Sequence, residues 1–278
     1  MSTQLTPALS DATLQLEGGV ALVTFNRHDI RNALTGSQLI DDILKVIDWA
    51  NQDSRVAVLV FTGAGSAFSA GGNIKEMQHR DTTHKDGAFS GDVYQVQEKY
   101  RRGIQQIPLA MEKTEVPTIA AINGPAIGAG FDFACMCDIR IGSDNARMGE
   151  TFVNLGIIPG DGGAWFLQRL IGYQRAAELT FTGRVIDASE ARSLGILLEV
   201  VSPEALLEHT LSIAAQMAAK PPQALRLTKR LMKSAQRLEL PDFLDQCALF
   251  QGICHNTEDH LEAVSAFIEK RPGDFNGR

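Results

Sequence analysis

Two glycine-rich turns constrain the fold of this chain more than any other feature of its sequence. They occupy residues 68–74 (FSAGGNI) and 124–132 (GPAIGAGFD), and each follows a run of apolar residues. Glycine lets a backbone approach a neighbour or a ligand closely, and the first NH groups of a helix have no partner within that helix. We interpret each turn as a connection from a buried strand into a helix. Repeated units of strand, turn and helix predict an α/β architecture with helices packed on sheets.

The spacing of apolar residues gives the order of the remaining elements. We predict strands at 13–16, 20–25, 56–61, 117–122 and 138–142, helices at 37–50, 94–113 and 127–137, and a polar loop at 79–92. Beyond residue 163 nearly every segment has helical spacing, namely 174–181, 188–194, 203–219, 222–234, 242–253 and 257–270. We therefore predict a core over residues 1–196 and a helical C-terminal region over residues 197–278.

The composition and net charge of the chain disfavour some classes of function. With 278 residues, 44% of them hydrophobic, the chain can bury a large core. Its formal net charge of -7 disfavours nonspecific attraction to nucleic acid or to an anionic membrane, which requires a basic surface. The segment 1–19 lacks the basic and apolar parts of a secretory signal, and polar residues interrupt the apolar stretch at 116–137. We expect a cytoplasmic protein with no membrane or nucleic-acid partner, four reduced cysteines and no metal site.

Several catalytic motifs are missing from the sequence. It contains no GxxxxGK[ST], no GxGxxG, no HExxH and no GxSxG. These absences disfavour nucleotide hydrolysis, zinc-protease chemistry and α/β-hydrolase catalysis. The two glycine turns could instead direct two backbone NH donors at one oxygen atom. Either turn alone is better explained as a tight strand-to-helix connection, but the pair favours a functional site.

The segments FSAGGNIKEM (68–77) and INGPAIGAGFDFACMCDIR (122–140) resemble the crotonase, or enoyl-CoA hydratase/isomerase, family. The similarity continues in chain order through NRHDIRNAL (26–34), LGIIPGDGG (155–163) and AFIEKRPGDF (266–275). It implies a crotonase-like spiral of repeated strand-strand-helix units with a C-terminal helical trimerisation region. It also implies a homotrimer or a dimer of trimers that acts on an acyl-CoA substrate.

The resemblance also implies a set of site residues. The NH groups of Gly72 and Ala129 are expected to form an oxyanion hole for the thioester carbonyl and to stabilise its enolate. The coenzyme A moiety of the substrate would lie near Arg31, Ala33, Ala70, Asn73 and Ile74, and a neighbouring subunit would supply Phe267 and Lys270. No cofactor beyond this coenzyme A is expected. For Arg31 and Lys270 an ordinary solvated surface charge is an equal alternative.

The departures from the family pattern concern the acid/base groups. Hydratases of this family use two glutamates, and the corresponding positions here hold Asp132 and Phe152. A lone buried carboxyl between two phenylalanines suggests function for Asp132. Asp161 is a candidate for the second carboxyl, although it could be an ordinary helix N-cap. Glu150 is a further candidate, since on a strand it would share a face with Phe152.

We therefore expect an enzyme that shifts or hydrates a double bond of an acyl-CoA, and the loss of the second glutamate favours the shift. One alternative is a dehalogenase- or hydrolase-like enzyme on a bulky acyl-CoA, with Asp161 as a nucleophile. Another is a noncatalytic RNA-binding protein, suggested by a basic stripe on one predicted helix. The stripe comprises Arg226, Lys229, Arg230, Lys233 and Arg237. A solvated amphipathic face explains the same stripe without RNA.

Overall fold

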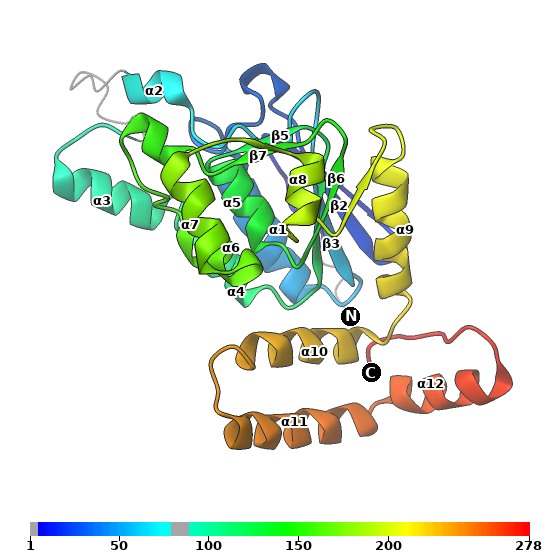
Figure 1. Cartoon of the computed structure of the whole chain (residues 1–278). Coiled ribbons are helices and arrows are strands. Elements are labelled where there is room, and N and C mark those ends of the chain that lie inside the picture. Colours follow the sequence, from blue (N-terminus) through cyan, green and yellow to red (C-terminus); the bar gives the residue numbers. More distant parts are fainter. Residues whose placement is uncertain (1–4, 79–88) are drawn as a thin grey trace.

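The computed structural model describes residues 5–78 and 89–278 (Figure 1). Its main sheet has the strand order β1-β2-β3-β4-β6-β9. These strands are β1 Ala12–Glu17, β2 Val20–Phe25, β3 Val58–Gly63, β4 Thr118–Ile122, β6 Ile139–Ser143 and β9 Glu199–Val201. Only β1 runs antiparallel to its neighbour in this sheet. A second sheet, in the order β5-β7-β8, contains β5 Pro125–Ile127, β7 Arg147–Gly149 and β8 Ile186–Asp187.

The helices of the described residues lie on both faces of the main sheet and in a separate layer beneath it (Figure 1). They are α1 Leu39–Gln52, α2 Ile74–Gln78, α3 Val93–Arg102, α4 Gln106–Lys113, α5 Ala129–Met136, α6 Gly163–Ile171, α7 Tyr173–Thr182, α8 Ala188–Ser193, α9 Leu206–Ala218, α10 Pro222–Ser234, α11 Leu240–His255 and α12 Glu258–Glu269. Strands β3 and β4 are buried on both faces, which explains their nearly continuous apolar sequences. In the described part of the chain, no helix is long and apolar enough to cross a membrane.

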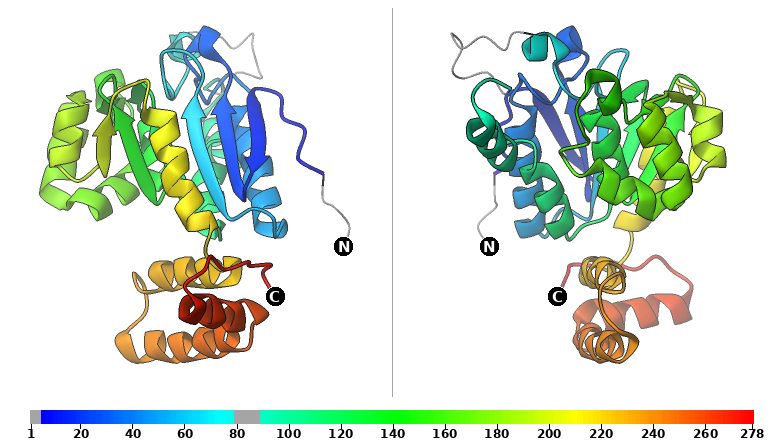
Figure 2. Two further views of the ribbon diagram at one scale, coloured as in Figure 1. Left: turned by 90° about the vertical axis from the view of Figure 1, so that its right-hand side faces the viewer. Right: turned by 60° about the vertical axis from the view of Figure 1, so that its left-hand side comes forward.

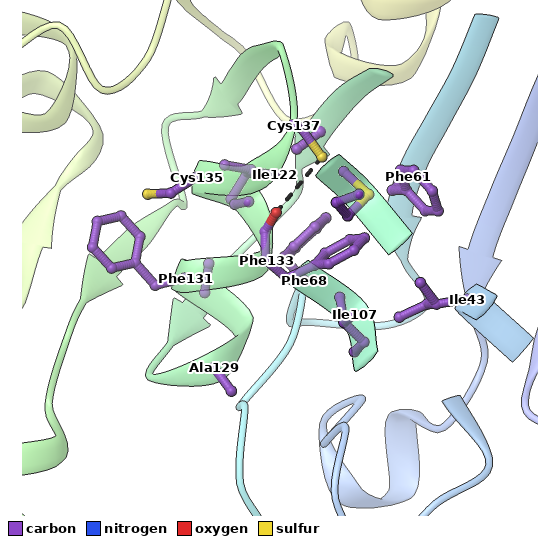
Figure 3. Packing of buried hydrophobic residues seen from close by; sticks show 14 of the residues in the cluster. Ile43, Phe61, Phe68, Ile107, Ile122, Ala129, Phe131, Phe133, Cys135 and Cys137 are labelled. Atoms are coloured by element: carbon purple, nitrogen blue, oxygen red, sulfur yellow. Dashed lines mark hydrogen bonds between the residues drawn. The ribbon is translucent and has the colours of Figure 1, made fainter. Parts of the chain in front are cut away.

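Aromatic side chains fix α5 against the main sheet (Figure 3). The ring of Phe133 on α5 lies with its centroid 5.1 Å from that of Phe61 on β3. It also stacks on Phe68, which opens the first glycine turn, at 6.3 Å. Because Phe68 and Phe133 share one buried cluster, the first turn and the helix that follows the second turn are held together. The N-terminus of α5 is positioned by this packing.

Two predicted helices differ from the observed ones. The helix predicted over 94–113 is divided into α3 and α4 because the backbone leaves the helical region at Gly103, with φ -105° and ψ -112°. The helix predicted from residue 127 begins at Ala129 instead. Gly128 has φ 53° and ψ -125°, so the chain first completes β5 and then turns into α5. Residues 79–88 of the predicted polar loop lie outside the described residues.

The main sheet and its helical cover continue past the predicted boundary at residue 196. Strand β9 pairs with β6, with Glu199 opposite Ile141, and α9 packs on β2, β3, β4 and β6. The separate helical layer consists of α10, α11 and α12, which lie beneath the α/β body in Figures 1 and 2. The chain passes into this layer after α9, at residues 219–221.

The basic stripe of α10 docks this layer onto the α/β body. Arg226 donates hydrogen bonds to the carbonyls at the end of α1, including those of Ala50 and Asn51. Lys233 donates to the carbonyls of Met111 and Glu112 in α4. Carbonyls at a helix C-terminus lack partners within the helix and attract cations. Both sequence-based readings of the stripe, an RNA-binding surface and a solvated face, are therefore wrong for these two residues.

The other basic residues of the stripe also have partners. Lys229 is 6% exposed and lies 2.7 Å from Asp138. The guanidinium of Arg230 lies 5.1 Å from the ring centroid of Phe250, and Arg237 pairs with Glu112 on α4. The stripe is thus largely an internal contact.

Candidate active site

The structure brings the two glycine turns side by side. The NH of Ile127 donates to the carbonyl of Ser69 at 3.0 Å, and Ser69 forms a parallel bridge with Ala126. A Cβ atom on Gly71 would lie 2.3 Å from the Ile127 carbonyl oxygen and 2.8 Å from the Ala129 nitrogen, and Gly71 has φ 75°. Only glycine fits such a contact in this conformation. The first turn therefore passes directly against the first residue of α5.

The segment 26–34 supports the first turn from the other side. The NH of Leu34 donates to the Gly71 carbonyl at 2.7 Å, and the NH of Ala70 donates to the Arg31 carbonyl at 2.9 Å. Arg31 itself has the left-handed φ of 52°. The hydroxyl of Thr35 accepts a hydrogen bond from the Asn73 NH at 2.8 Å. These bonds hold the turn rigidly, as a preorganised donor site requires.

Two backbone NH groups remain available at this junction. Within the described residues, neither the NH of Gly72 nor that of Ala129 donates to a protein acceptor. Both residues line a cavity of about 420 Å³. Most backbone NH groups in a fold have a partner, and two without one that line the same cavity are both open to a ligand bound there. The arrangement supports, at the level of geometry, the role expected for Gly72 and Ala129.

One carboxyl group faces this cavity. Among the described residues that line it, Asp161 is the single acidic one. Much of the remaining wall is apolar, with Ile74, Ile127, Phe152 and Leu155 among its members. Asp161 is 4% exposed and precedes α6, whose first residue is Gly163. An acid/base group and two NH donors therefore meet in one largely apolar space.

Asp132 lies behind Asp161 and is fully buried. Among the described residues, neither oxygen of its carboxyl meets an NH or OH donor, and its partner is the carboxyl of Asp161. Two carboxyls can form a hydrogen bond only when one of them carries a proton. Burial, followed by the charge of Asp161, raises the pKa of Asp132 well above its usual value. A proton shared by the pair therefore resides preferentially on Asp132.

Asp161 carries the charge of this pair. Burial raises its pKa, while the hydrogen bond from Asp132 and those from the backbone NH groups of Asp161 and Gly163 counteract the rise. The N-cap of α6 is Gly162, one residue after Asp161, and no side-chain hydrogen bond caps this helix. The N-cap role predicted as the alternative for Asp161 is therefore wrong.

Glu150 belongs to the same buried cluster but not to the cavity wall. It is 0% exposed, and its Oε2 accepts a hydrogen bond from Thr180 on α7. Burial raises its pKa to about 7, with the nearby charge of Asp161 adding to the shift. The strand geometry predicted for this segment is wrong, since β7 ends at Gly149 and a 3-10 helix begins at Phe152. Phe152 lines the cavity, whereas Glu150 is enclosed.

The residues expected to bind coenzyme A fall into two groups. Ala70 and Ile74 line the cavity, and Arg31, Ala33 and Asn73 flank the same turn. Phe267 and Lys270, at the end of α12, belong to the helical layer and do not line the cavity of their own chain. Tyr100 on α3 also lines the cavity and was not identified from the sequence. An aromatic residue within a helical pattern gives no sign that it faces a site.

An α/β spiral with a helical C-terminal layer is the architecture of the crotonase class. A family model described as enoyl-CoA hydratase/isomerase matches residues 15–278. The chain therefore belongs to the enoyl-CoA hydratase/isomerase family, and it is an acyl-CoA enzyme of that type.

Comparisons with individual proteins agree. The chain is 38% identical over 266 residues to the short-chain-enoyl-CoA hydratase of Clostridium acetobutylicum, covering 95% of this chain and 96% of that protein. It is 32% identical over 270 residues to the 2,3-dehydroadipyl-CoA hydratase of Escherichia coli, covering 97% and 100%. The crystal structure of enoyl-CoA hydratase from Bacillus anthracis has a TM-score of 0.88 and 32% identity, covering 97% and 100%.

Proposed function

We propose that this enzyme converts a 3-enoyl-CoA into a 2-enoyl-CoA, with Asp161 moving the proton. The observation that carries this proposal is that Asp161 is the single acidic residue among the described residues of the cavity wall. A double-bond shift needs one group that takes a proton from one carbon and returns it to another. It needs no cofactor beyond the coenzyme A of the substrate.

The proposed steps use the groups that line the cavity. The thioester carbonyl accepts hydrogen bonds from the NH groups of Gly72 and Ala129. The carboxylate of Asp161 takes a proton from C2, and the electron pair left on carbon moves onto the thioester oxygen as an enolate. As the enolate collapses, Asp161 returns the proton to C4 and the double bond moves to C2 and C3. Loss of one oxyanion donor typically costs about 3 to 4 kcal/mol of barrier.

Asp132 supports this step without touching the substrate. It is fully buried and does not line the cavity. Its protonated carboxyl donates to Asp161 and so stabilises the ionised form that acts as the base. Asp132 is thus a positioning residue, and Asp161 is the catalytic one.

Hydration of a 2-enoyl-CoA is the second candidate reaction. The relatives from Clostridium acetobutylicum and Escherichia coli are both named as hydratases. Phe152, in the position where hydratases of the family carry their second glutamate, cannot hold the attacking water. Hydration would therefore require another polar group in the cavity wall.

We further propose that the enzyme is a homotrimer or a dimer of trimers, in which a neighbouring copy contributes Phe267 and Lys270 to the coenzyme A site. Arg31, Ala33, Ala70, Asn73 and Ile74 would contact the nucleotide from within the chain. Support comes from the exposure of large apolar side chains on the helical layer, since such patches mark protein interfaces. Phe267 is 85% exposed and Ile268 is 73% exposed.

The test is an assay of the purified enzyme with a 3-enoyl-CoA and with crotonyl-CoA, followed by absorbance and by mass spectrometry. We expect Asp161→Asn to lose double-bond migration by about two to four powers of ten. Asp132→Asn, which keeps a donor beside Asp161, should retain more activity. Migration that proceeds at the wild-type rate in Asp161→Asn would overturn the proposal.

A further inference from the structure

Tyr100 stands beside Asp161 at the cavity wall. A Cβ atom on Gly160, the residue before Asp161, would lie 2.9 Å from Cε1 of Tyr100, so the ring packs directly on this glycine. The outer side of the ring faces Phe89, with the centroids 6.4 Å apart. Tyr100 also lines the wider groove between α2 and α3, which has a volume of about 1220 Å³. Its side chain therefore lies where the groove meets the cavity.

Hydrogen bonds fix Tyr100 relative to the Asp161 loop. The side chain of Gln105 donates from Nε2 to the Gly160 carbonyl at 2.7 Å. The NH of Gln105 in turn donates to the Tyr100 carbonyl at 3.1 Å. The end of α3 and the loop before α6 are thus joined through one residue. A tyrosine held this way keeps a constant position with respect to Asp161.

The Tyr100 hydroxyl is available to a ligand. Among the described residues, it has no protein partner for a hydrogen bond, unlike the backbone groups around it. The cavity wall to which Tyr100 belongs is largely apolar and includes Phe89, Leu155 and Ile157. A hydroxyl in such a setting is stabilised when a ligand oxygen pairs with it.

We propose that the Tyr100 hydroxyl binds the oxygen that is added to or removed from C3 of the acyl chain, and that it thereby takes over the water-holding role of the missing second glutamate, while Asp161 alone exchanges the proton. The oxygen belongs to water in the forward direction and to a 3-hydroxyl group in reverse. The proposal rests on the role proposed above for Asp161.

The reaction balances with one carboxylate. The water oxygen, held by Tyr100, forms a bond to C3 while one of its protons passes to Asp161. The electron pair of the double bond moves onto the thioester oxygen, where Gly72 and Ala129 donate to it. Asp161 then delivers the proton to C2, so that one molecule of water has been added. Tyr100 donates its hydrogen bond throughout and does not itself lose a proton.

The electrostatics of the site fit a neutral donor. Burial, and then the charge of Asp161, raises the pKa of Tyr100 above the ordinary phenol value. The hydroxyl therefore stays protonated across the physiological range. It can donate to water without competing with Asp161 for the role of base.

The test compares Tyr100→Phe with the matched control Tyr94→Phe, which removes a hydroxyl from the exposed part of the same helix. Hydration of crotonyl-CoA and migration of the double bond of a 3-enoyl-CoA are measured for each. We expect Tyr100→Phe to lower kcat/KM for hydration about 10- to 100-fold, as loss of one specific hydrogen bond allows, and to change migration less than about 3-fold. The control should change neither.

A second measurement distinguishes a direct contact between Tyr100 and the ligand oxygen from a structural effect of the substitution. The dissociation constants of 3-hydroxybutyryl-CoA and butyryl-CoA differ by one ligand oxygen. The wild type should favour the hydroxylated ligand, and Tyr100→Phe should lose that preference while its affinity for butyryl-CoA is unchanged.

Three results would overturn the inference: a wild type that hydrates no enoyl-CoA, a preference that survives in Tyr100→Phe, or equal losses of hydration and migration. None of these results would contradict the role of Asp161 in double-bond migration. That role would be contradicted by a different result, namely migration retained in Asp161→Asn.

Discussion

The carboxyl of Asp132 lies against the α-carbon of Gly163, the first residue of α6. A Cβ atom on Gly163 would come within 2.1 Å of Oδ2 and 2.3 Å of Oδ1 of Asp132. Asp132 is fully buried, so it has no space into which to retreat. The absence of a side chain at residue 163 therefore allows Asp132 to reach Asp161.

Gly163→Ala should consequently separate the two carboxyls. We expect it to destabilise the fold by about 1 to 3 kcal/mol, as overpacking of a core does, and to lower double-bond migration by at least about tenfold. The control is Gly252→Ala on α11, where a Cβ atom would meet nothing within 4 Å. Urea unfolding and the enzyme assay check both variants. If Gly163→Ala had the stability and activity of the wild type, the contact between Asp132 and residue 163 would not require glycine.

This contact illustrates what the sequence could and could not predict. The two glycine turns and the carboxyls at 132 and 161 were identifiable, because glycines and isolated acidic residues stand out in apolar segments. The contact of Asp132 with Gly163 depends on how α5 packs on α6, and no local pattern reports that packing. For the same reason the basic spacing of α10 indicated an amphipathic helix but not that Arg226 and Lys233 would cap two other helices.

The pH dependence of activity should follow the hydrogen bond between the two aspartates. The base must be ionised, so activity rises with pH through the pKa of Asp161. The hydrogen bond from Asp132 lowers that pKa. Asp132→Ala removes the donor, and we therefore expect the acid limb of the kcat/KM profile to move to higher pH, with a smaller movement in Asp132→Asn. An acid limb that stays in place or moves to lower pH in Asp132→Ala would contradict this relation.

The stability of the protein should fall as pH rises toward 8. The pKa of Glu150 is raised from 4.5 to about 7, so between these values the folded state binds a proton that the unfolded state has released. The resulting stabilisation is complete below the unfolded pKa and is lost as pH rises through about 7.

Between pH 5 and 8, Glu150→Gln should reduce the change in the free energy of unfolding by about 2 kcal/mol. The exposed Glu208→Gln on α9 should leave it unchanged. Urea unfolding at several pH values, at one protein concentration, gives the slopes. Identical slopes for the wild type and Glu150→Gln would contradict the assignment.

The docking of the helical layer should depend on Lys229 far more than on Arg237. Lys229 is 6% exposed and donates to the Val116 carbonyl and to Asp138, each at 2.7 Å. Lys229→Met leaves both acceptors without this partner and should cost about 2 to 4 kcal/mol. Arg237→Gln breaks a largely exposed pair and should cost less than about 1 kcal/mol. Denaturation midpoints at equal protein concentration compare them, and equal losses would contradict the docking role.

In the proposed reaction one carboxyl, that of Asp161, carries the proton between two carbons of the substrate. The most direct measurement is a single turnover of a 3-enoyl-CoA labelled with deuterium at C2, with the label located in the 2-enoyl product by mass spectrometry and NMR. The account predicts deuterium at C4 in a measurable fraction of the product from the wild type, and a turnover slowed by about two to four powers of ten in Asp161→Asn. The proposal would be contradicted if the wild-type product carried no deuterium at C4 and Asp161→Asn formed product as fast as the wild type.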